Sequence, residues 1–448
     1  MTTPTRLALG LGAVAACLRL PLALTTPFWQ DEVASARIIG QPTFGDALHQ
    51  VVRTESTPPL WYVLAWLLHR LGTPLYELRL LSVVEDGLLI TLVVVFAARV
   101  LSLRFALLAG ALVAVGSEFS AEGRWIRAYE LSALLTLVLV LALLRAAARP
   151  TAGRLAVLAL AVAAGSLSHY FFLFTIVAAV LWTIVEPSAR AARGRLLAAE
   201  AVGLVPFALW SPWFVTQFRH DRYSWIGSFD WREVLSTPLR LFTPDGSGSV
   251  LVAGGCLTVA VCAAGSVILW RRSPVGRAVV LCAVTPLAVA ALVWAAGVRV
   301  YAVRNLIGAG PFLAIAAAAA LAALPSRVRV TVPAAVLLAA TASFAWAQHL
   351  PGPAYDRIAH ALVADGWRPG DAVAVFGNRA EFRSPLEWYL PGRPRLSNLA
   401  ATRIDEPLFV VGGRSLTVGR LPARRLRLER PLLEDAAIFA TSRAPSRA

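Results

Sequence analysis

The sequence predicts an α-helical polytopic membrane protein that ends in a small α/β domain. Of the 448 residues, 58% are hydrophobic and only 15% are charged, with a mean hydropathy of +0.66. Such a composition is typical of a chain that crosses the bilayer many times. Long apolar runs fill the chain up to about residue 350, and none follows. We therefore expect a transmembrane domain over 1–350 and a separate domain over 351–448.

Eleven apolar segments are candidate transmembrane helices. A helix needs about 20 residues to cross the hydrocarbon core of a bilayer. The first run ends just before two adjacent carboxylates, Asp31 and Glu32, which places them at a membrane surface. The eleven segments are 7–26, 80–98, 105–119, 131–147, 155–168, 171–185, 196–216, 250–270, 278–297, 306–324 and 330–347.

Arginine clusters between these segments predict the orientation. The net charge of +16 comes from arginines in short groups, which is the pattern of cytoplasmic loops rather than of a nucleic-acid-binding face. With eleven spans, every cluster lies on the side of Arg6, so the remaining loops and 351–448 are expected to be extracytoplasmic. The clusters are Arg99/Arg104, Arg145/Arg149/Arg154, Arg190/Arg193/Arg195, Arg271/Arg272/Arg277 and Arg327/Arg329.

An interfacial helix and the elements of the C-terminal domain complete the predicted architecture. Residues 59–71 are apolar and aromatic, but they are few for a span, and a span here would reverse every later cluster. We expect them to form an interfacial helix in an outer loop. In the C-terminal domain, 354–365 is predicted as a helix, whereas 372–376 and 408–411 are predicted as buried strands.

The ionisable residues indicate group-transfer chemistry at the outer surface. Few ionisable residues lie in the apolar runs. Among these few are Glu85 and Asp86, and Arg19 could pair with them. The outer loops combine carboxylates, which can act as general bases, with arginines, which can hold a phosphate bidentately. Because the sequence has no Walker or glycine-rich dinucleotide motif, the donor is expected to be a lipid phosphate. A transporter or flippase of lipid-linked sugars is the alternative, but it would need polar residues near the midplane.

Four stretches of the sequence resemble motifs of the GT-C glycosyltransferases, in the branch of the protein O-mannosyltransferases and lipid A aminoarabinose transferases. Residues 29–32 (Trp-Gln-Asp-Glu) resemble the acidic motif of the first outer loop. The other stretches are Thr-Pro-Pro-Leu-Trp-Tyr at 57–62 with Glu-Leu-Arg-Leu-Leu-Ser at 77–82, the second-loop sequence 121–129, and Tyr-Ala-Val-Arg at 301–304 with Pro311. The resemblance implies an inverting transfer from a polyprenyl-monophosphate sugar to an acceptor hydroxyl.

The resemblance also implies roles for individual residues. Asp31 is the expected general base, supported by Glu32, and Arg304 is the expected ligand of the donor phosphate. Arg127 and Tyr129 are expected to contact the donor, although a purely structural pair remains open. Either Glu122 or Glu130 is the acid of the second loop. Further candidates for substrate binding are His169, Tyr301, His220 and Arg222.

The expected partners follow from this chemistry. They are a polyprenyl-phosphate-linked sugar, a lipid, glycan or protein acceptor, and the cell membrane, with no nucleic acid. The sequence predicts no metal ligands and no cofactor, while a divalent metal ion remains open.

Overall fold

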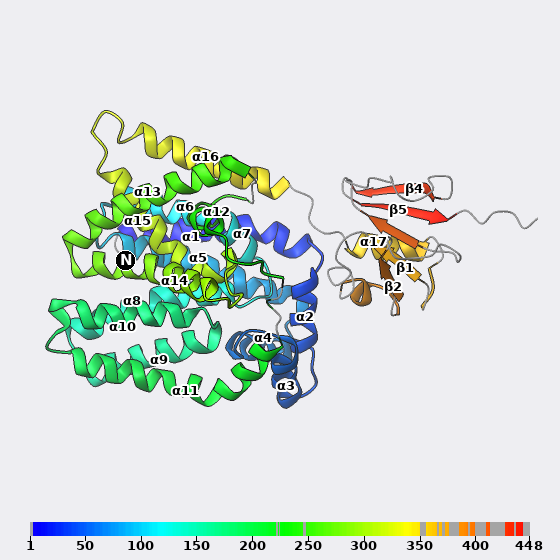
Figure 1. Cartoon of the computed structure of the whole chain (residues 1–448), viewed down its shortest axis with the longest axis horizontal. Helices are drawn as coiled ribbons and strands as arrows, with labels where there is room; N and C mark the ends of the chain where they lie inside the picture. Colours follow the sequence, from blue (N-terminus) through cyan, green and yellow to red (C-terminus); the bar gives the residue numbers. More distant parts are fainter. Residues whose placement is uncertain are drawn as a thin grey trace, which may run out of the picture. The chain divides into compact units, whose positions relative to one another are not determined.

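The structure is a computed structural model in which the chain forms two compact units (Figure 1). One unit contains Met1–Leu24 and Ile38–Ala347, and the other contains Thr25–Arg37 and Gln348–Ala448. The residues that the structure describes are 3–220, 223, 225–244, 248–349, 355–364, 367–369, 372–375, 385–392, 395–398, 409–412, 426–433 and 436–441.

The first unit is a bundle of apolar helices that match the eleven predicted spans. Within the described residues, eight helical segments are long and apolar enough to cross a membrane, and three shorter apolar helices accompany them. The eight segments contain α1 (Thr3–Thr25), α5 (Arg79–Ala97), α8 (Tyr129–Ala148), α11 (Arg193–Arg219), α13 (Gly248–Arg272), α14 (Pro274–Ala295), α15 (Gly310–Ala322) and α16 (Thr331–His349), and the shorter ones are α6 (Leu103–Ala114), α9 (Ala152–Ser168) and α10 (Phe172–Val185).

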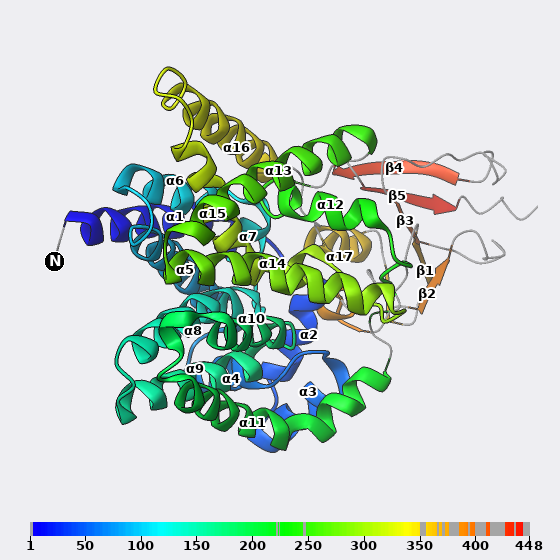
Figure 2. The same cartoon turned by 60° about the vertical axis from the view of Figure 1, so that its left-hand side comes forward.

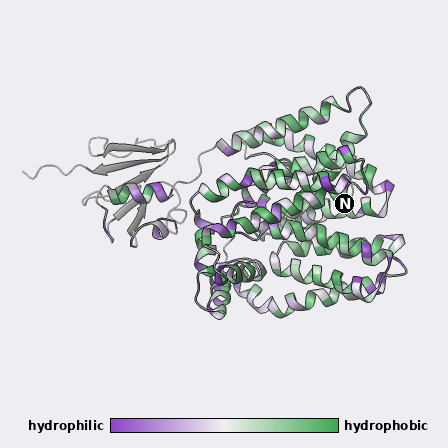
Figure 3. Ribbon diagram, turned by 180° about the vertical axis from the view of Figure 1, so that it is seen from behind, coloured by the Kyte–Doolittle hydropathy of each residue, from purple (hydrophilic) through white to green (hydrophobic). Residues whose placement is uncertain are grey.

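Packing and polarity in this unit are those of a membrane protein. Helix α9 packs between α8 and α11, as Figures 1 and 2 show. Hydrophobic residues cover the length of the helices, whereas hydrophilic residues gather mainly at helix ends and in loops (Figure 3). Lipid cannot hydrogen-bond to backbone groups. A continuous helix can cross it because the helix satisfies these groups internally.

Two predicted spans are not single α-helices in the structure. The predicted span 105–119 ends earlier, because α6 stops at Ala114 and a short helix, α7 (Ser117–Glu122), follows Gly116. A Cβ on Gly116 would lie 2.9 Å from the Phe119 ring, so this close turn favours glycine. The predicted span 306–324 begins as a 3-10 helix, η3 (Val303–Ala309), before α15. Pro311 lies in the first turn of α15, where its missing N–H costs no hydrogen bond.

Three helices of 10 or 11 residues lie in the loops of the bundle. The predicted interfacial helix is present as α4 (Leu60–Arg70), which at 11 residues is about 16 Å long and cannot span a bilayer. Figure 1 shows α4 nearly end-on where α8 and α10 run across the view. The sequence analysis did not predict α3 (Phe44–Thr54) or α12 (Trp231–Arg240). Both are amphipathic and capped by side chains, Thr43 for α3 and Asp230 for α12.

A buried ion pair joins α1 to α5. Arg19 Nε lies 3.3 Å from Asp86 Oδ2, and the two side chains are 1% and 0% exposed, which confirms the expected pairing. Arg19 also donates from Nη2 to the Ala114 carbonyl at 2.7 Å. Nearby, a Cβ on Gly12 would lie 2.3 Å from the Gly87 carbonyl oxygen, so the two backbones meet where neither has a side chain. A buried pair of this kind favours one register of α1 against α5.

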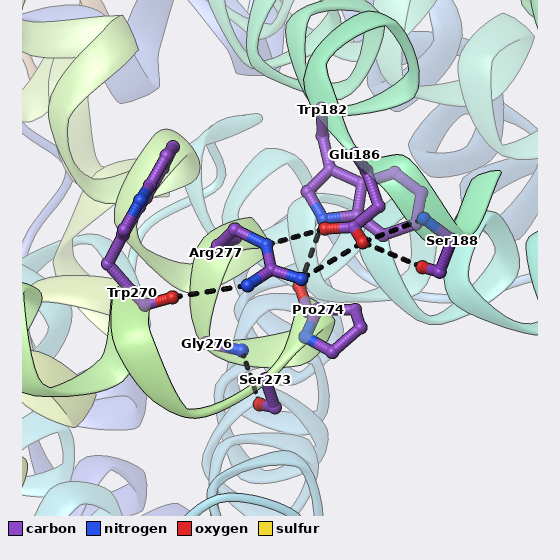
Figure 4. A network of polar contacts seen from close by, with 8 residues as sticks. All are labelled: Trp182, Glu186, Ser188, Trp270, Ser273, Pro274, Gly276 and Arg277. Carbon is purple, nitrogen blue, oxygen red and sulfur yellow. Dashed lines mark hydrogen bonds and ion pairs between the residues drawn. The ribbon is translucent and has the colours of Figure 1, made fainter. Parts of the chain in front are cut away.

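A second ion pair joins the C-terminal end of α10 to the first turn of α14 (Figure 4). Arg277 donates to both carboxylate oxygens of Glu186, at 2.6 and 3.0 Å, while Ser188 donates to the same carboxylate through its N–H and its hydroxyl. Desolvation raises the pKa of Glu186, but these hydrogen bonds together lower it below its ordinary value. Trp182 Nε1 adds a hydrogen bond of 2.9 Å to the Pro274 carbonyl. One arginine of a predicted cytoplasmic cluster is thus fixed in a bidentate pair.

The second unit contains a five-stranded mixed sheet in the order β2-β1-β3-β5-β4. β1 pairs in parallel with β2 and β3, and β5 pairs antiparallel with β3 and β4. The predicted helix 354–365 and strands 372–376 and 408–411 correspond to α17, β1 and β3, with bounds that differ by one or two residues where described. The elements are α17 (Tyr355–Ala364), β1 (Ala372–Val375), β2 (Arg395–Asn398), β3 (Phe409–Gly412), β4 (Leu426–Leu433) and β5 (Ala436–Thr441).

The second unit also holds the acidic motif, which the predicted domain 1–350 had included. Residues 25–37 contain the start of α2 (Gln30–Ile39) and group with the C-terminal residues. The physical reason is a set of contacts to residues 387–389, among them a hydrogen bond from the Phe28 N–H to the Tyr389 hydroxyl at 2.6 Å. A contact between residues 361 positions apart leaves no local pattern in the sequence.

Candidate functional site

A cavity of about 550 Å³ lies in the helical unit between α7, α12 and residues 301–304. Its volume is in the range of small-molecule sites. Three predicted site residues, Glu122, Tyr301 and Arg304, line it. Other charged residues in its wall are Glu118, Asp230, Glu233 and Arg240.

Aromatic rings form much of the cavity wall. Trp294 and Tyr301 stack with their ring centroids 5.0 Å apart and their planes 15° from parallel. Trp294 Nε1 donates to the Gly227 carbonyl at 3.0 Å, which holds the loop before α12 against α14. Burial raises the pKa of Tyr301 to about 12, so its hydroxyl is protonated at neutral pH. Such a wall offers flat apolar faces and a hydrogen-bond donor to a ligand.

Arg304 lies where this wall meets the rest of the site. Its guanidinium carbon is 5.1 Å from the centroid of the Trp225 ring and 6.0 Å from that of Tyr129. Both distances are within the range of cation–π attraction. Arg304 is half-buried, whereas the Trp225 side chain is 58% exposed. The two rings therefore limit the directions that the guanidinium can take.

Arg127 approaches Tyr129 as well and is fixed by other partners. Its guanidinium carbon lies 5.8 Å from the ring centroid of Tyr129. Nη1 lies 3.1 Å from Glu55 Oε2 and 3.1 Å from the Tyr62 hydroxyl. Arg127 is 7% exposed, and it does not line the cavity. The structure thus brings Arg127, Tyr129 and Arg304 into one cluster.

His169 belongs to this cluster as a neutral side chain. Its ring lies 5.0 Å from Tyr129 and 5.5 Å from Phe171, centroid to centroid, and it is 2% exposed. Burial, and then the positive charges of Arg127 and Arg304, lower the pKa of His169 to about 3. Nδ1 accepts a hydrogen bond from the Phe171 N–H at 3.3 Å, which leaves the proton on Nε2. A role in phosphate binding can therefore use only a neutral N–H donor.

The two candidate acids of the second loop occupy different places. Glu122, at the end of α7, lines the cavity. Glu130, in the first turn of α8, is fully buried, and within the described residues its carboxylate oxygens have no hydrogen-bond partner. It interacts electrostatically with Asp86 and Arg19 inside the bundle. The geometry therefore favours Glu122 as the acid that faces a ligand.

The remaining predicted residues lie outside this cluster. Asp31 and Glu32 are in the first turn of α2, in the other unit. Glu32 is fully buried and accepts a hydrogen bond of 3.4 Å from the Trp29 N–H, whereas Asp31 is partly exposed. His220 follows α11 directly and is exposed. Arg222 lies outside the residues that the structure describes.

Several cavity residues were not recognised from the sequence. Asp230, Glu233 and Arg240 fall in a segment that was treated as an outer loop, and Trp294 in a segment treated as a plain span. Arg240 Nη1 pairs with Glu233 Oε2 on α12, seven residues apart. The alternation of polar and apolar residues over 231–240 at helical spacing is the signal that could have revealed this helix.

Metal binding can be assessed only for the described part of the chain. There, no three His, Cys, Asp or Glu side chains come together in a way that could hold a metal ion. The acids of the cavity are accompanied by arginines, which lower the affinity of such a site for a cation. The expected absence of a metal, with a divalent ion left open, therefore stays a prediction.

Comparisons with known proteins identify the fold. No protein-family model matches the sequence, and no curated protein is significantly similar to it. The structure is similar to that of ArnT from Cupriavidus metallidurans, a GT-C superfamily member, in the apo state, with a TM-score of 0.53 and 14% identity over 96% of this chain and 97% of that chain. The chain has the GT-C fold.

Two further structures are similar to the chain. ArnT from the same organism, bound to undecaprenyl phosphate, gives a TM-score of 0.54 and 15% identity over 97% of both chains. An oligosaccharyltransferase of Archaeoglobus fulgidus in complex with zinc and sulfate gives a TM-score of 0.49 and 14% identity. This match covers 87% of this chain and 62% of that chain. The GT-C fold, a polytopic helical membrane fold, confirms the resemblance read from the four sequence motifs.

The lowered pKa of His169 predicts a dependence of stability on pH. Between pH 6.5 and about 3, the unfolded chain binds a proton at this residue that the folded protein does not, so the free energy of unfolding falls as the pH falls. Acidification from pH 7.5 to 5 should lower it by about 2 kcal/mol through His169. In His169→Gln this part of the loss should vanish, as measured by unfolding in detergent at both pH values.

The control for this prediction is His49→Gln. His49 is exposed on α3, and its replacement should leave the acid-induced loss as in the wild type. Equal losses in the wild type and in His169→Gln would show that His169 is solvated and charged in the folded protein.

Proposed function

We propose that the protein is an inverting membrane glycosyltransferase that moves a sugar from a polyprenyl-monophosphate donor to an acceptor hydroxyl. The observation that carries the proposal is the convergence of Arg127 and Arg304 on the ring of Tyr129, beside a cavity walled by aromatic rings and carboxylates. Two guanidinium groups close together favour an anion, while aromatic faces and carboxylates favour a sugar.

The donor phosphate is assigned to Arg304. Arg304 lines the cavity, whereas Arg127 does not and is ion-paired with Glu55. A guanidinium can hold two phosphate oxygens at once and stabilise the charge that develops on them as the glycosidic bond breaks. The stacking of Arg304 between Trp225 and Tyr129 restricts its rotamers before the donor binds, which reduces the entropy lost on binding.

The sugar is assigned to the aromatic part of the cavity. Stacked Trp294 and Tyr301 offer a flat apolar face to the C–H groups of a sugar ring. Glu118 and Glu122 lie in the same wall and can accept hydrogen bonds from sugar hydroxyl groups. A volume of about 550 Å³ accommodates one monosaccharide, not a long oligosaccharide.

A lipid donor is supported by the membrane fold and by one of the similar structures. The helical unit is built from helices that can cross a bilayer. ArnT, which has the same fold, is known in complex with undecaprenyl phosphate. A transferase in detergent should form product with a polyprenyl-phosphate sugar and an acceptor, whereas a transporter or flippase requires two compartments. Incubation of the purified protein with a panel of labelled polyprenyl-phosphate sugars therefore tests the proposed activity directly.

Asp31 is the proposed general base. Glu32 is fully buried and accepts the Trp29 N–H, so its carboxylate shapes the first turn of α2. Asp31 is partly exposed and can reach an acceptor. In an inverting transfer, the base removes the proton of the acceptor hydroxyl as the oxygen attacks the anomeric carbon opposite the departing phosphate.

The arginine clusters support an extracytoplasmic active site. In a background with the four native cysteines replaced by serine, Thr73→Cys should react with an impermeant thiol reagent on intact cells. Thr151→Cys, between Arg149 and Arg154, should react only after lysis. The reverse pattern would invert the proposed orientation.

Replacement of Arg304 should weaken use of the donor. Arg304→Ala removes a charge-assisted contact worth about 1.5–3 kcal/mol, so kcat/KM for the donor should fall roughly tenfold to hundredfold. Arg304→Lys should recover only part of the loss, because an ammonium cannot copy the planar fork. Arg299→Ala, at an exposed position outside the cavity, is the control. Unchanged donor dependence in Arg304→Ala would remove Arg304 from the phosphate site.

Replacement of Asp31 should affect the chemical step. Asp31→Asn keeps the shape of the side chain but removes its basicity, so turnover should fall at least ~10²-fold while donor affinity stays within a few-fold of the wild type. Glu32→Gln should be milder, since an amide oxygen can still accept the Trp29 N–H. Single-turnover rates and donor affinities in both variants are the measurement. Normal turnover in Asp31→Asn with an inactive Glu32→Gln would assign the base to Glu32.

A further inference from the structure

The second unit contains a short helical turn that has two different sides. Residues 385–390 contribute Leu386 and Leu390 to a buried apolar cluster with Leu362 of α17 and Trp367. The three residues between the two leucines, 387–389, contact residues 25–37, and Tyr389 packs against the apolar cluster as well. The turn is therefore fixed to the C-terminal core on one side and to the acidic motif on the other.

Three contacts connect the turn to the motif. The Tyr389 hydroxyl accepts a hydrogen bond of 2.6 Å from the Phe28 N–H. The ring centroids of Trp388 and Phe28 lie 6.1 Å apart, with the planes tilted by 54°. Glu387 Oε2 lies 3.4 Å from Arg37 Nη2.

These contacts bracket the proposed base. Phe28 precedes Asp31 by three residues, and Arg37 follows it by six. Phe28 is fully buried, so its N–H would lose a hydrogen bond without the Tyr389 hydroxyl. Helix α2, which starts at Gln30, is thus held just before its first turn and in its last turn.

We infer that Glu387, Trp388 and Tyr389 are positioning residues that hold α2 so that Asp31 meets the acceptor hydroxyl in one orientation. The inference rests on the proposed function and assigns the C-terminal unit a role in the rate of transfer rather than in donor binding. A base that is displaced by about 1 Å can lose a large part of its effect, whereas phosphate recognition by Arg304 does not depend on it.

The three contacts should contribute unequally. Removal of the Tyr389 hydroxyl takes away the acceptor that the structure gives to the buried Phe28 N–H. This should speed hydrogen exchange of the first turn of α2 roughly tenfold. The side chains of Arg37 and Glu387 are 38% and 22% exposed, so solvent screens their attraction. Loss of that pair alone should have an effect of only about two- to threefold.

The experiment uses the full-length protein in detergent with two measurements. Hydrogen exchange of the amides in 28–37 reports the hold on the motif without any substrate. Single-turnover rate and donor KM report the effect on transfer. The variants are Tyr389→Phe, Glu387→Arg, and Glu387→Arg combined with Arg37→Glu. The control is Arg357→Glu at an exposed position of α17, which makes the same charge change as Arg37→Glu, and one of equal size to Glu387→Arg, away from the motif.

We expect faster exchange at 28–37 and a roughly tenfold lower single-turnover rate in Tyr389→Phe, with donor KM unchanged. Glu387→Arg should show smaller changes in the same direction, and the double reversal should restore both measurements. Wild-type exchange in Tyr389→Phe overturns the inference, as does faster exchange with a normal transfer rate. If the wild type transfers no sugar from any donor, the proposed function fails, and with it the role in transfer, while the exchange data still decide whether 387–389 hold the motif.

Discussion

The ion pair between Arg127 and Glu55 is the interaction on which the site in the helical unit depends. Arg127 is 7% exposed and Glu55 is 5% exposed, so neither charge can rely on water. Their contact at 3.1 Å connects the loop before α8 to the end of α3, and Tyr62 of α4 adds a hydrogen bond to the same Nη1. Loss of one partner would leave a buried charge, which is more costly than loss of an exposed pair.

The position of Arg127 explains the protonation of its neighbours. The guanidinium groups of Arg127 and Arg304 lie close to the ring of Tyr129, and His169 packs against the same ring. Burial, and then repulsion by these two cations, keeps His169 neutral. In the proposed transfer, two positive charges without a protonated histidine would bind one phosphate and release it afterwards. An additional fixed cation would strengthen product binding and slow that release.

The sequence predicted those features that depend on local pattern. The eleven apolar segments and the interfacial helix at 60–70 follow from run length, composition and arginine placement, and the structure contains all of them. The short amphipathic helices α3 and α12 were missed, because their stability comes from packing and capping rather than from hydrophobic length. Tyr301 was predicted, but its stacking partner Trp294 was missed, because stacking between a span and a loop has no signature in composition.

Several carboxylates of the protein form ion pairs with arginines. Such a pair affects whether a carboxylate can act as a general base. Glu55, Asp86 and Glu186 each lie within 3.3 Å of an arginine nitrogen. A carboxylate in such a pair loses the ion pair when it accepts a proton, so it is a poor general base. Helix α2, which carries Asp31, contains one arginine, Arg37. Its Nη2 lies 3.4 Å from Glu387 Oε2. In the proposed transfer, the contact of Glu387 with Arg37 near the end of α2 serves to hold the helix that carries Asp31 in its first turn.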